Sequence, residues 1–180
     1  WDVKIMAVAG SSGLTSTILE AYGYVLAQKK LWIDLQGMKG ANVVATNSSF
    51  GVDRADCNSN DYPVWNDIYN EMGKYGVLSA AATANQRYDV DVVGDVPTQC
   101  SSPFIVAVTN TTAEDRIYSS AAWGKISVDI GAPGTTIWST LPKNSSGSLT
   151  GTSMATPQVT GAIGLLHSLA SKEFSTYFHA

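Results

Sequence analysis

Residues 149–157 have the sequence LTGTSMATP and join a polar stretch to an apolar one. The segment 152–171 is apolar on nearly all sides, which predicts a long, central, buried helix. Gly151 permits a sharp turn before this helix and a close approach by another chain. Thr152 or Ser153 can serve there as an ordinary N-cap. Alternatively, Ser153 can be a nucleophile, because the unpaired N–H groups and the dipole of a helix N-terminus stabilise an oxyanion formed beside it.

Apolar strand-like segments alternate with helical segments along the rest of the chain. Strands are expected at 3–9, 41–46, 76–82, 104–108, 126–130 and 136–140. Helices are expected at 64–75 and around a capping box formed by Thr17 and Glu20. A flexible polar loop is expected at 141–150. Strands that are apolar throughout indicate a mostly parallel sheet with helices on both faces, which is a three-layer α/β fold. Ligands bind at the carboxyl ends of such strands. We therefore expect the chemistry in the polar segments 47–51, 83–85 and 150–153.

The composition describes one globular domain. The 180 residues suffice for a sizeable core, and 44% hydrophobic with 14% charged residues is not the balance of a disordered chain. A net charge of −4 gives no reason to expect nucleic acid or an anionic membrane as a partner. No apolar run approaches the ~20 residues that a membrane-spanning helix needs.

The two cysteines, Cys57 and Cys100, lie in polar, loop-like stretches. A buried free thiol is more usual in an apolar segment. A disulfide in a secreted protein is therefore favoured over two free thiols.

The string GTSMATP at 151–157, followed by an apolar helix, resembles the serine motif of the subtilisin-like serine proteases, the subtilase family. Residues 81–85 (AATAN) resemble the family segment that ends in the oxyanion-hole asparagine, here Asn85, and residues 49–51 (SFG) resemble its substrate-binding strand. The resemblance covers nearly the whole chain. It implies a subtilisin-like fold in which residues 1–180 are the oxyanion-hole and nucleophile half of a catalytic domain.

The resemblance also implies roles for single residues. Ser153 would attack a peptide carbonyl and form an acyl-enzyme. The Asn85 side chain and the Ser153 N–H would hold the oxyanion, although an asparagine after a strand can also be a plain turn residue. An extended polypeptide substrate would pair with residues 49–51 as an added strand. The implied substrate-binding residues are Ser49, Phe50, Gly51, Ala82, Thr83, Ala84, Gly151 and Thr152.

The sequence departs from the family in lacking a histidine before Ser153. In subtilisins the acid and the base precede the serine, but the two histidines here are His167 and His179, and the upstream aspartates match no family acid motif. His167 lies ~21 Å from Ser153 along one helix, which is beyond hydrogen-bond reach. We therefore expect the catalytic Asp and His to lie N-terminal to Trp1. We also expect this chain to pair with that missing half or with itself, and to be inactive alone.

Two further points concern the pocket and metals. The family usually has Ala-Gly where this chain has Thr83-Ala84, so the Ala84 methyl is expected to narrow the specificity pocket. Clusters of Asp and Asn at 53–61 and 89–95 leave calcium possible, but calcium takes six to eight oxygens and no EF-hand spacing occurs. Solvated loop acids are the favoured interpretation, and no cofactor is expected.

The favoured function is a secreted serine endopeptidase, represented by a fragment. The first alternative is an inactive subtilase-fold binding or scaffolding module. The second is a nucleotide-binding α/β domain that uses Gly10 to Gly13, but that loop has neither a full GxGxxG nor a Walker lysine.

Overall fold

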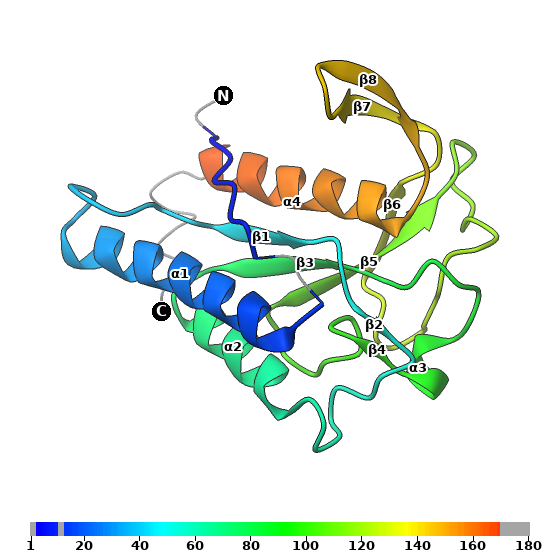
Figure 1. Ribbon diagram of the computed structural model, residues 1–180, viewed down its shortest axis with the longest axis horizontal. Helices are drawn as coiled ribbons and strands as arrows, with labels where there is room; N and C mark the ends of the chain where they lie inside the picture. Colours follow the sequence, from blue (N-terminus) through cyan, green and yellow to red (C-terminus); the bar gives the residue numbers. More distant parts are fainter. Residues whose placement is uncertain (1–2, 11–12, 170–180) are drawn as a thin grey trace.

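A four-stranded parallel sheet forms the centre of the computed structural model, which describes residues 3–10 and 13–169 (Figure 1). The sheet order is β1-β3-β5-β6, and every neighbouring pair is parallel. The strands are β1 (Ala45–Ser48), β3 (Leu78–Ala82), β5 (Ile105–Thr111) and β6 (Ile130–Pro133). Because all four run the same way, their carboxyl ends meet at one edge of the sheet.

Helices cover both faces of this sheet. Helices α1 (Thr15–Asp34) and α2 (Pro63–Lys74) lie side by side on one face, and α4 (Thr152–Leu169) contacts all four strands from the other (Figure 1). This arrangement confirms the predicted three-layer α/β fold.

The layers on the two faces are packed differently. On the α1/α2 face, Trp65, Tyr69 and Met72 of α2 are fully buried, as their helical spacing predicts. On the α4 face the buried residues are small, with Ala80 and Ala155 in contact with Val108. Small side chains let α4 lie close to the sheet, and the position of Ser153 at the start of α4 is thereby fixed relative to the strand ends.

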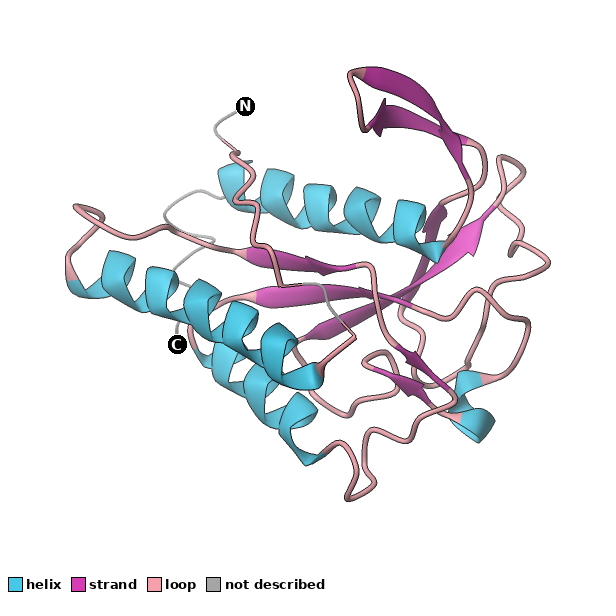
Figure 2. Cartoon of the chain, viewed as in Figure 1, coloured by secondary structure: helices cyan, strands magenta, loops and turns pink. Residues whose placement is uncertain are grey.

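Two smaller antiparallel pieces lie outside the central sheet (Figure 2). Strands β7 (Ile137–Leu141) and β8 (Ser145–Leu149) form a hairpin that leads into α4. Strands β2 (Val52–Asp53) and β4 (Asp95–Val96) form a short ribbon next to the helical turn α3 (Val90–Val93).

Three of the predicted elements are wrong, because strand formation depends on pairing and contacts between distant segments that a local pattern does not contain. Residues 3–9 form no strand, since no described strand pairs with them, and Ile5 is 96% exposed. The strand expected at 126–130 begins only at Ile130, because the Asp91 carboxylate accepts hydrogen bonds from the Ile126 and Ser127 N–H groups. Half of the polar stretch 141–150 is strand β8, and its first residue ends β7, so the stretch is not simply a flexible loop.

The predicted start of the first helix and the predicted burial of the last helix are also wrong. The capping box does not form, because α1 begins at Thr15, so that its N-cap is Leu14 and Thr17 lies inside the helix. Helix α4 is not buried on all sides, since Leu166 is 64% and Leu169 71% exposed. Val3 of the N-terminal segment lies next to Gly164 of this helix, so the helix is covered in part and exposed in part.

A disulfide joins Cys57 to Cys100 and excludes two free thiols. The two cysteines follow β2 and β4 in sequence, so the bond closes the loops that extend from this ribbon.

We expect the double variant Cys57→Ser/Cys100→Ser to lower the free energy of unfolding of the full-length protein by about 2–4 kcal/mol, because the bond closes a long loop in the unfolded chain. Urea unfolding followed by tryptophan fluorescence measures this. Ser101→Ala, at an exposed neighbour of Cys100, is the matched control. Equal unfolding midpoints for the double variant and this control would contradict the prediction.

Candidate active site

The carboxyl ends of β1 and β3 meet the N-terminus of α4. Ser153 is the second residue of α4 and is half-buried. Its Oγ donates to the carbonyl oxygen of Ser49 at 3.4 Å, and the Ser49 Oγ donates to the Ser153 carbonyl oxygen at 3.0 Å. These paired bonds bring together two residues that lie 104 positions apart.

Asn85 follows β3 and is held against the first turn of α4. Its Oδ1 accepts from the Thr152 N–H at 2.9 Å, and the Thr152 Oγ1 lies 3.2 Å away. The Thr152 hydroxyl also donates to the carbonyl oxygen of Thr83 at 2.6 Å. The amide oxygen therefore faces the helix, and the Nδ2 group donates to no acceptor within the described part of the chain. An amide donor and the N–H groups of a helix N-terminus thus lie next to each other.

The turn before Ser153 is closely packed. A Cβ added at Gly151 would lie 3.2 Å from the Asn85 Oδ1, which is tighter than an ordinary contact. The Gly151 N–H donates to the Gly134 carbonyl at 2.9 Å. A side chain at position 134 would not fit, because a Cβ added at Gly134 would lie 2.6 Å from the Asn110 Oδ1. Asn110, fully buried at the end of β5, supports the serine turn and was not predicted as a site residue.

A cavity of about 200 Å³ opens beside Ser153. Nearly all the predicted site residues line it: Ser49, Phe50, Gly51, Ala82, Thr83, Ala84, Asn85, Thr152 and Ser153. Gly151 is the exception and only shapes the turn. Three lining residues were not predicted, namely Asp53, Gln86 and Asp95.

Ala84 is part of the cavity wall. It is buried against a small cluster that includes Tyr88 and Ala122, and its N–H donates to the Asp95 Oδ2 at 3.2 Å. Whether its methyl group narrows the specificity pocket stays a prediction.

Asp95 lies within the segment 89–95 that was interpreted as solvated loop acids, and for this residue the interpretation is wrong. Its side chain is buried, with 1% of the residue exposed. Burial raises the pKa of the Asp95 carboxyl to about 6, although hydrogen bonds from Thr98 and the Ala84 N–H oppose the rise. The sequence could not indicate this, because β2 and β4 are too short to show periodicity.

The pKa of the nearby Tyr88 phenol is also affected by burial and by the charge of Asp95. Burial, and then the charge of Asp95, raise the pKa of Tyr88 to about 12. The Tyr88 hydroxyl donates to the Asp95 Oδ1 at 3.3 Å, and the guanidinium of Arg54 lies 4.8 Å from the ring centroid.

No general base contacts Ser153 in residues 3–10 and 13–169, where the Ser49 carbonyl is the acceptor of its hydroxyl. His167 lies in the last turn of α4, far along the helix from Ser153, and His179 falls outside the described residues. The described residues also contain no group of three or more His, Cys, Asp or Glu side chains placed to hold a metal ion. None of the described helices is long and apolar enough to cross a membrane.

Comparisons with known proteins agree on one family. The sequence profile of the subtilase family matches residues 1–177. The chain is 29% identical over 159 residues to "Subtilisin-like protease 3" of Trichophyton tonsurans, and 31% identical over 159 residues to "Subtilisin-like protease 4" of Arthroderma gypseum. These alignments cover 88% of this chain and 35% of each relative.

A solved structure gives the same result. The crystal structure of a cold adapted subtilisin-like serine proteinase matches with a TM-score of 0.63 and 26% sequence identity, over 88% of this chain and 50% of that one. The chain thus spans about a third to a half of the length of the proteins it matches.

Proposed function

Because the chain belongs to the subtilase family, we propose that it carries the nucleophile and the oxyanion hole of a serine endopeptidase. The observation that supports this best is the Asn85 amide, which Thr152 holds beside the helix turn that presents Ser153. A plain N-cap serine would not need an amide donor fixed next to it.

In the proposed reaction, the Ser153 Oγ attacks the carbonyl carbon of a peptide bond and transfers its proton to a base. The oxyanion that forms is stabilised by the Asn85 Nδ2 and the Ser153 N–H. The protonated base then gives its proton to the leaving nitrogen, and collapse of the tetrahedral intermediate expels the amine and leaves an acyl-enzyme on Ser153. Water then hydrolyses the acyl-enzyme. Because Asn85 is already oriented by Thr152, little reorganisation is needed as charge develops.

The substrate is proposed to lie as an extended chain along residues 49–51. This segment continues from the carboxyl end of β1, so a peptide could pair with its backbone as an added strand. The side chain that precedes the cleaved bond would then enter the cavity beside Ser153.

The base and its acid partner are proposed to come from a polypeptide segment outside residues 1–180. The Ser49 carbonyl, which accepts the Ser153 hydroxyl at 3.4 Å, cannot take up a proton at neutral pH. A serine without a base is a weak nucleophile, so the isolated chain is expected to be inactive. Secretion is proposed as well, supported by the disulfide.

A binding or scaffolding module with the same fold is the second candidate, and the observation that favours it is that no base contacts Ser153 among the described residues. The endopeptidase and the binding module are distinguished by incubating the full-length polypeptide with an unfolded protein and testing for hydrolysis. We expect new peptide N-termini to appear with the native protein and none with Ser153→Ala. Retention of the unfolded protein in a complex, without any cleavage, would support the module and contradict the endopeptidase.

A further inference from the structure

We propose that the cavity beside Ser153 selects a cationic side chain, lysine or arginine, with Asp95 as its charge partner on the inner wall and Asp53 at the mouth. This inference rests on the proposed function, because the selected side chain belongs to the substrate residue whose carbonyl Ser153 attacks.

The two carboxylates face the same space. Asp53 lies in β2 and Asp95 in β4, and the antiparallel register places them directly opposite each other. Directly opposite residues in an antiparallel pair project from the same face. Both residues line the cavity together with Asn85 and Ser153, whereas none of the described Lys, Arg or His residues lines it.

Asp95 is a buried acid whose described partners are all uncharged. The donors to its carboxylate are the Thr98 hydroxyl, the Ala84 N–H and the Tyr88 hydroxyl. A carboxylate offers about four acceptor sites, so one remains for a further donor. An ionised carboxylate buried without a cation is costly, and its raised pKa has this cause. A cationic group that entered the cavity would remove part of that cost.

The cations of the chain that lie nearby are engaged elsewhere. The guanidinium of Arg54 lies over the ring of Tyr88 and donates to the Gln86 Oε1 at 3.5 Å. Arg87 lines a separate, mainly apolar hollow with Trp123.

The size and the walls of the cavity suit one long side chain. Its volume of about 200 Å³ is below the range typical of sites for whole small molecules. Phe50 and Ala82 provide apolar wall against which the methylene stem of a lysine or arginine can pack while its charged end reaches a polar partner.

The test uses the full-length enzyme and four peptide p-nitroanilides that differ only in the residue before the cleaved bond, which is Lys, Arg, Leu or Phe. We expect kcat/KM for Lys and Arg to exceed that for Leu and Phe by about tenfold or more. Hydrolysis of Leu or Phe at an equal or higher rate would overturn the inference and leave the endopeptidase intact. No hydrolysis of any of the four would overturn both.

Two variants identify the residues responsible. The quantity compared is kcat/KM for the Lys substrate divided by kcat/KM for the Leu substrate, called the Lys/Leu ratio. Asp53→Asn removes an exposed charge at the mouth of the cavity, and we expect this ratio to fall by about two- to fivefold. Asp95→Asn should lower that ratio by about 10- to 100-fold. Asp95 also accepts hydrogen bonds that support the cavity wall. The thermal unfolding of the Asp95→Asn variant is therefore measured in parallel. If Asp95→Asn unfolds, the Asp53→Asn ratio decides the inference.

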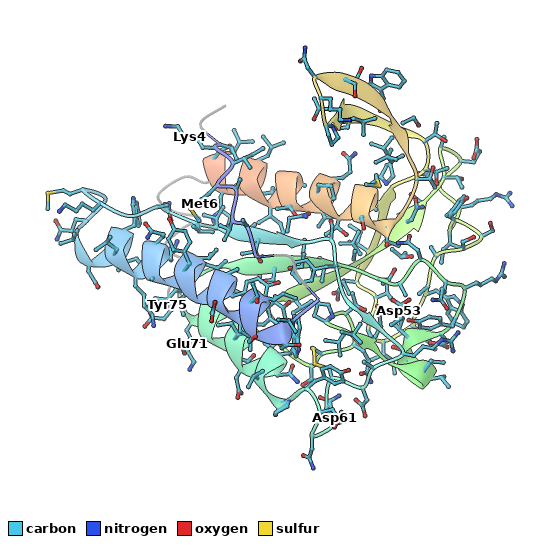
Figure 3. The ribbon with its side chains drawn as sticks, viewed as in Figure 1. Lys4, Met6, Asp53, Asp61, Glu71 and Tyr75 are labelled. Atoms are coloured by element: carbon cyan, nitrogen blue, oxygen red, sulfur yellow. A yellow bond between two sulfur atoms is a disulfide. The ribbon has the colours of Figure 1, made fainter. Side chains whose placement is uncertain are left out.

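Asp61→Asn is the matched control. It makes the same charge change in an exposed loop well away from Asp53, as the sticks in Figure 3 show. Its Lys/Leu ratio should equal that of the native enzyme. An equal fall in the control and in Asp53→Asn would show a general charge effect and overturn the inference.

The pH dependence of the same ratio gives a second readout. Asp95 is ionised above its pKa of about 6, so the preference for Lys over Leu should be lost as pH falls through this value. The charged or titratable groups around Asp95 are Asp53, Tyr88 and Arg54. Tyr88, whose pKa is about 12, keeps its charge state in this range. Taking the ratio of two substrates cancels the titration of the shared base. A ratio that is constant from pH 5 to pH 8 would count against Asp95 as the charge partner.

Discussion

Ser153→Ala is expected to lower kcat of the full-length enzyme by about a million-fold, which is the loss typical when the nucleophile of a serine triad is removed. The reason is that Ser153 supplies the atom that becomes acylated, and no neighbouring hydroxyl can replace it. Ser49 is nearby, but its Oγ donates to the Ser153 carbonyl oxygen. The measurement is hydrolysis of the best of the four p-nitroanilides under saturating substrate.

The control for this variant is Ser168→Ala, on the same helix and exposed to solvent. Its kcat should equal that of the native enzyme. If Ser153→Ala retained more than about a hundredth of native activity while remaining folded, Ser153 would not be the nucleophile.

Asn85→Asp is expected to lower kcat by about 10²–10³-fold, with much less change in KM. Aspartate has the shape of asparagine and keeps an oxygen for the Thr152 N–H, so the support of the first turn of α4 is retained. It lacks the amide donor that would stabilise the oxyanion, and its charge repels that oxyanion. Because the interaction forms only in the transition state, the loss should fall on kcat.

Asn60→Ala, in an exposed loop, is the comparison for this second variant and should leave both constants unchanged. A rise in KM with unchanged kcat for Asn85→Asp would place the side chain in ground-state binding instead. That result would remove it from the oxyanion hole.

The sequence was sufficient for the fold class and for most of the cavity. Helix α2 and strand β3 follow from local periodicity, because Trp65, Tyr69 and Met72 pack on the sheet as their spacing requires. The segments 49–51, 82–85 and 152–153 meet in space because parallel strands end at one edge. That inference needs only the order of strands and helices, and the family resemblance then supplied the roles.

What sequence reasoning missed depends on contacts between distant segments. Residues 3–9 have the composition of a strand, but a strand also needs a paired neighbour, and no described strand provides one. Asp91 prevents the strand at 126–130 through bonds across 35 positions. Asp95 reaches the cavity because a two-residue ribbon pairs it with Asp53, and so short a pairing leaves no periodic signal. For the same reason the charge of the cavity was not foreseen.

The most direct test of the central claim is intact-mass analysis of the full-length protein before and after a fluorophosphonate probe, followed by peptide mapping of the labelled site. The account predicts the addition of one probe mass, located on Ser153, with no labelling after heat denaturation or in Ser153→Ala. Labelling on a different serine, or none in a protein that cleaves peptides, would contradict Ser153 as the nucleophile.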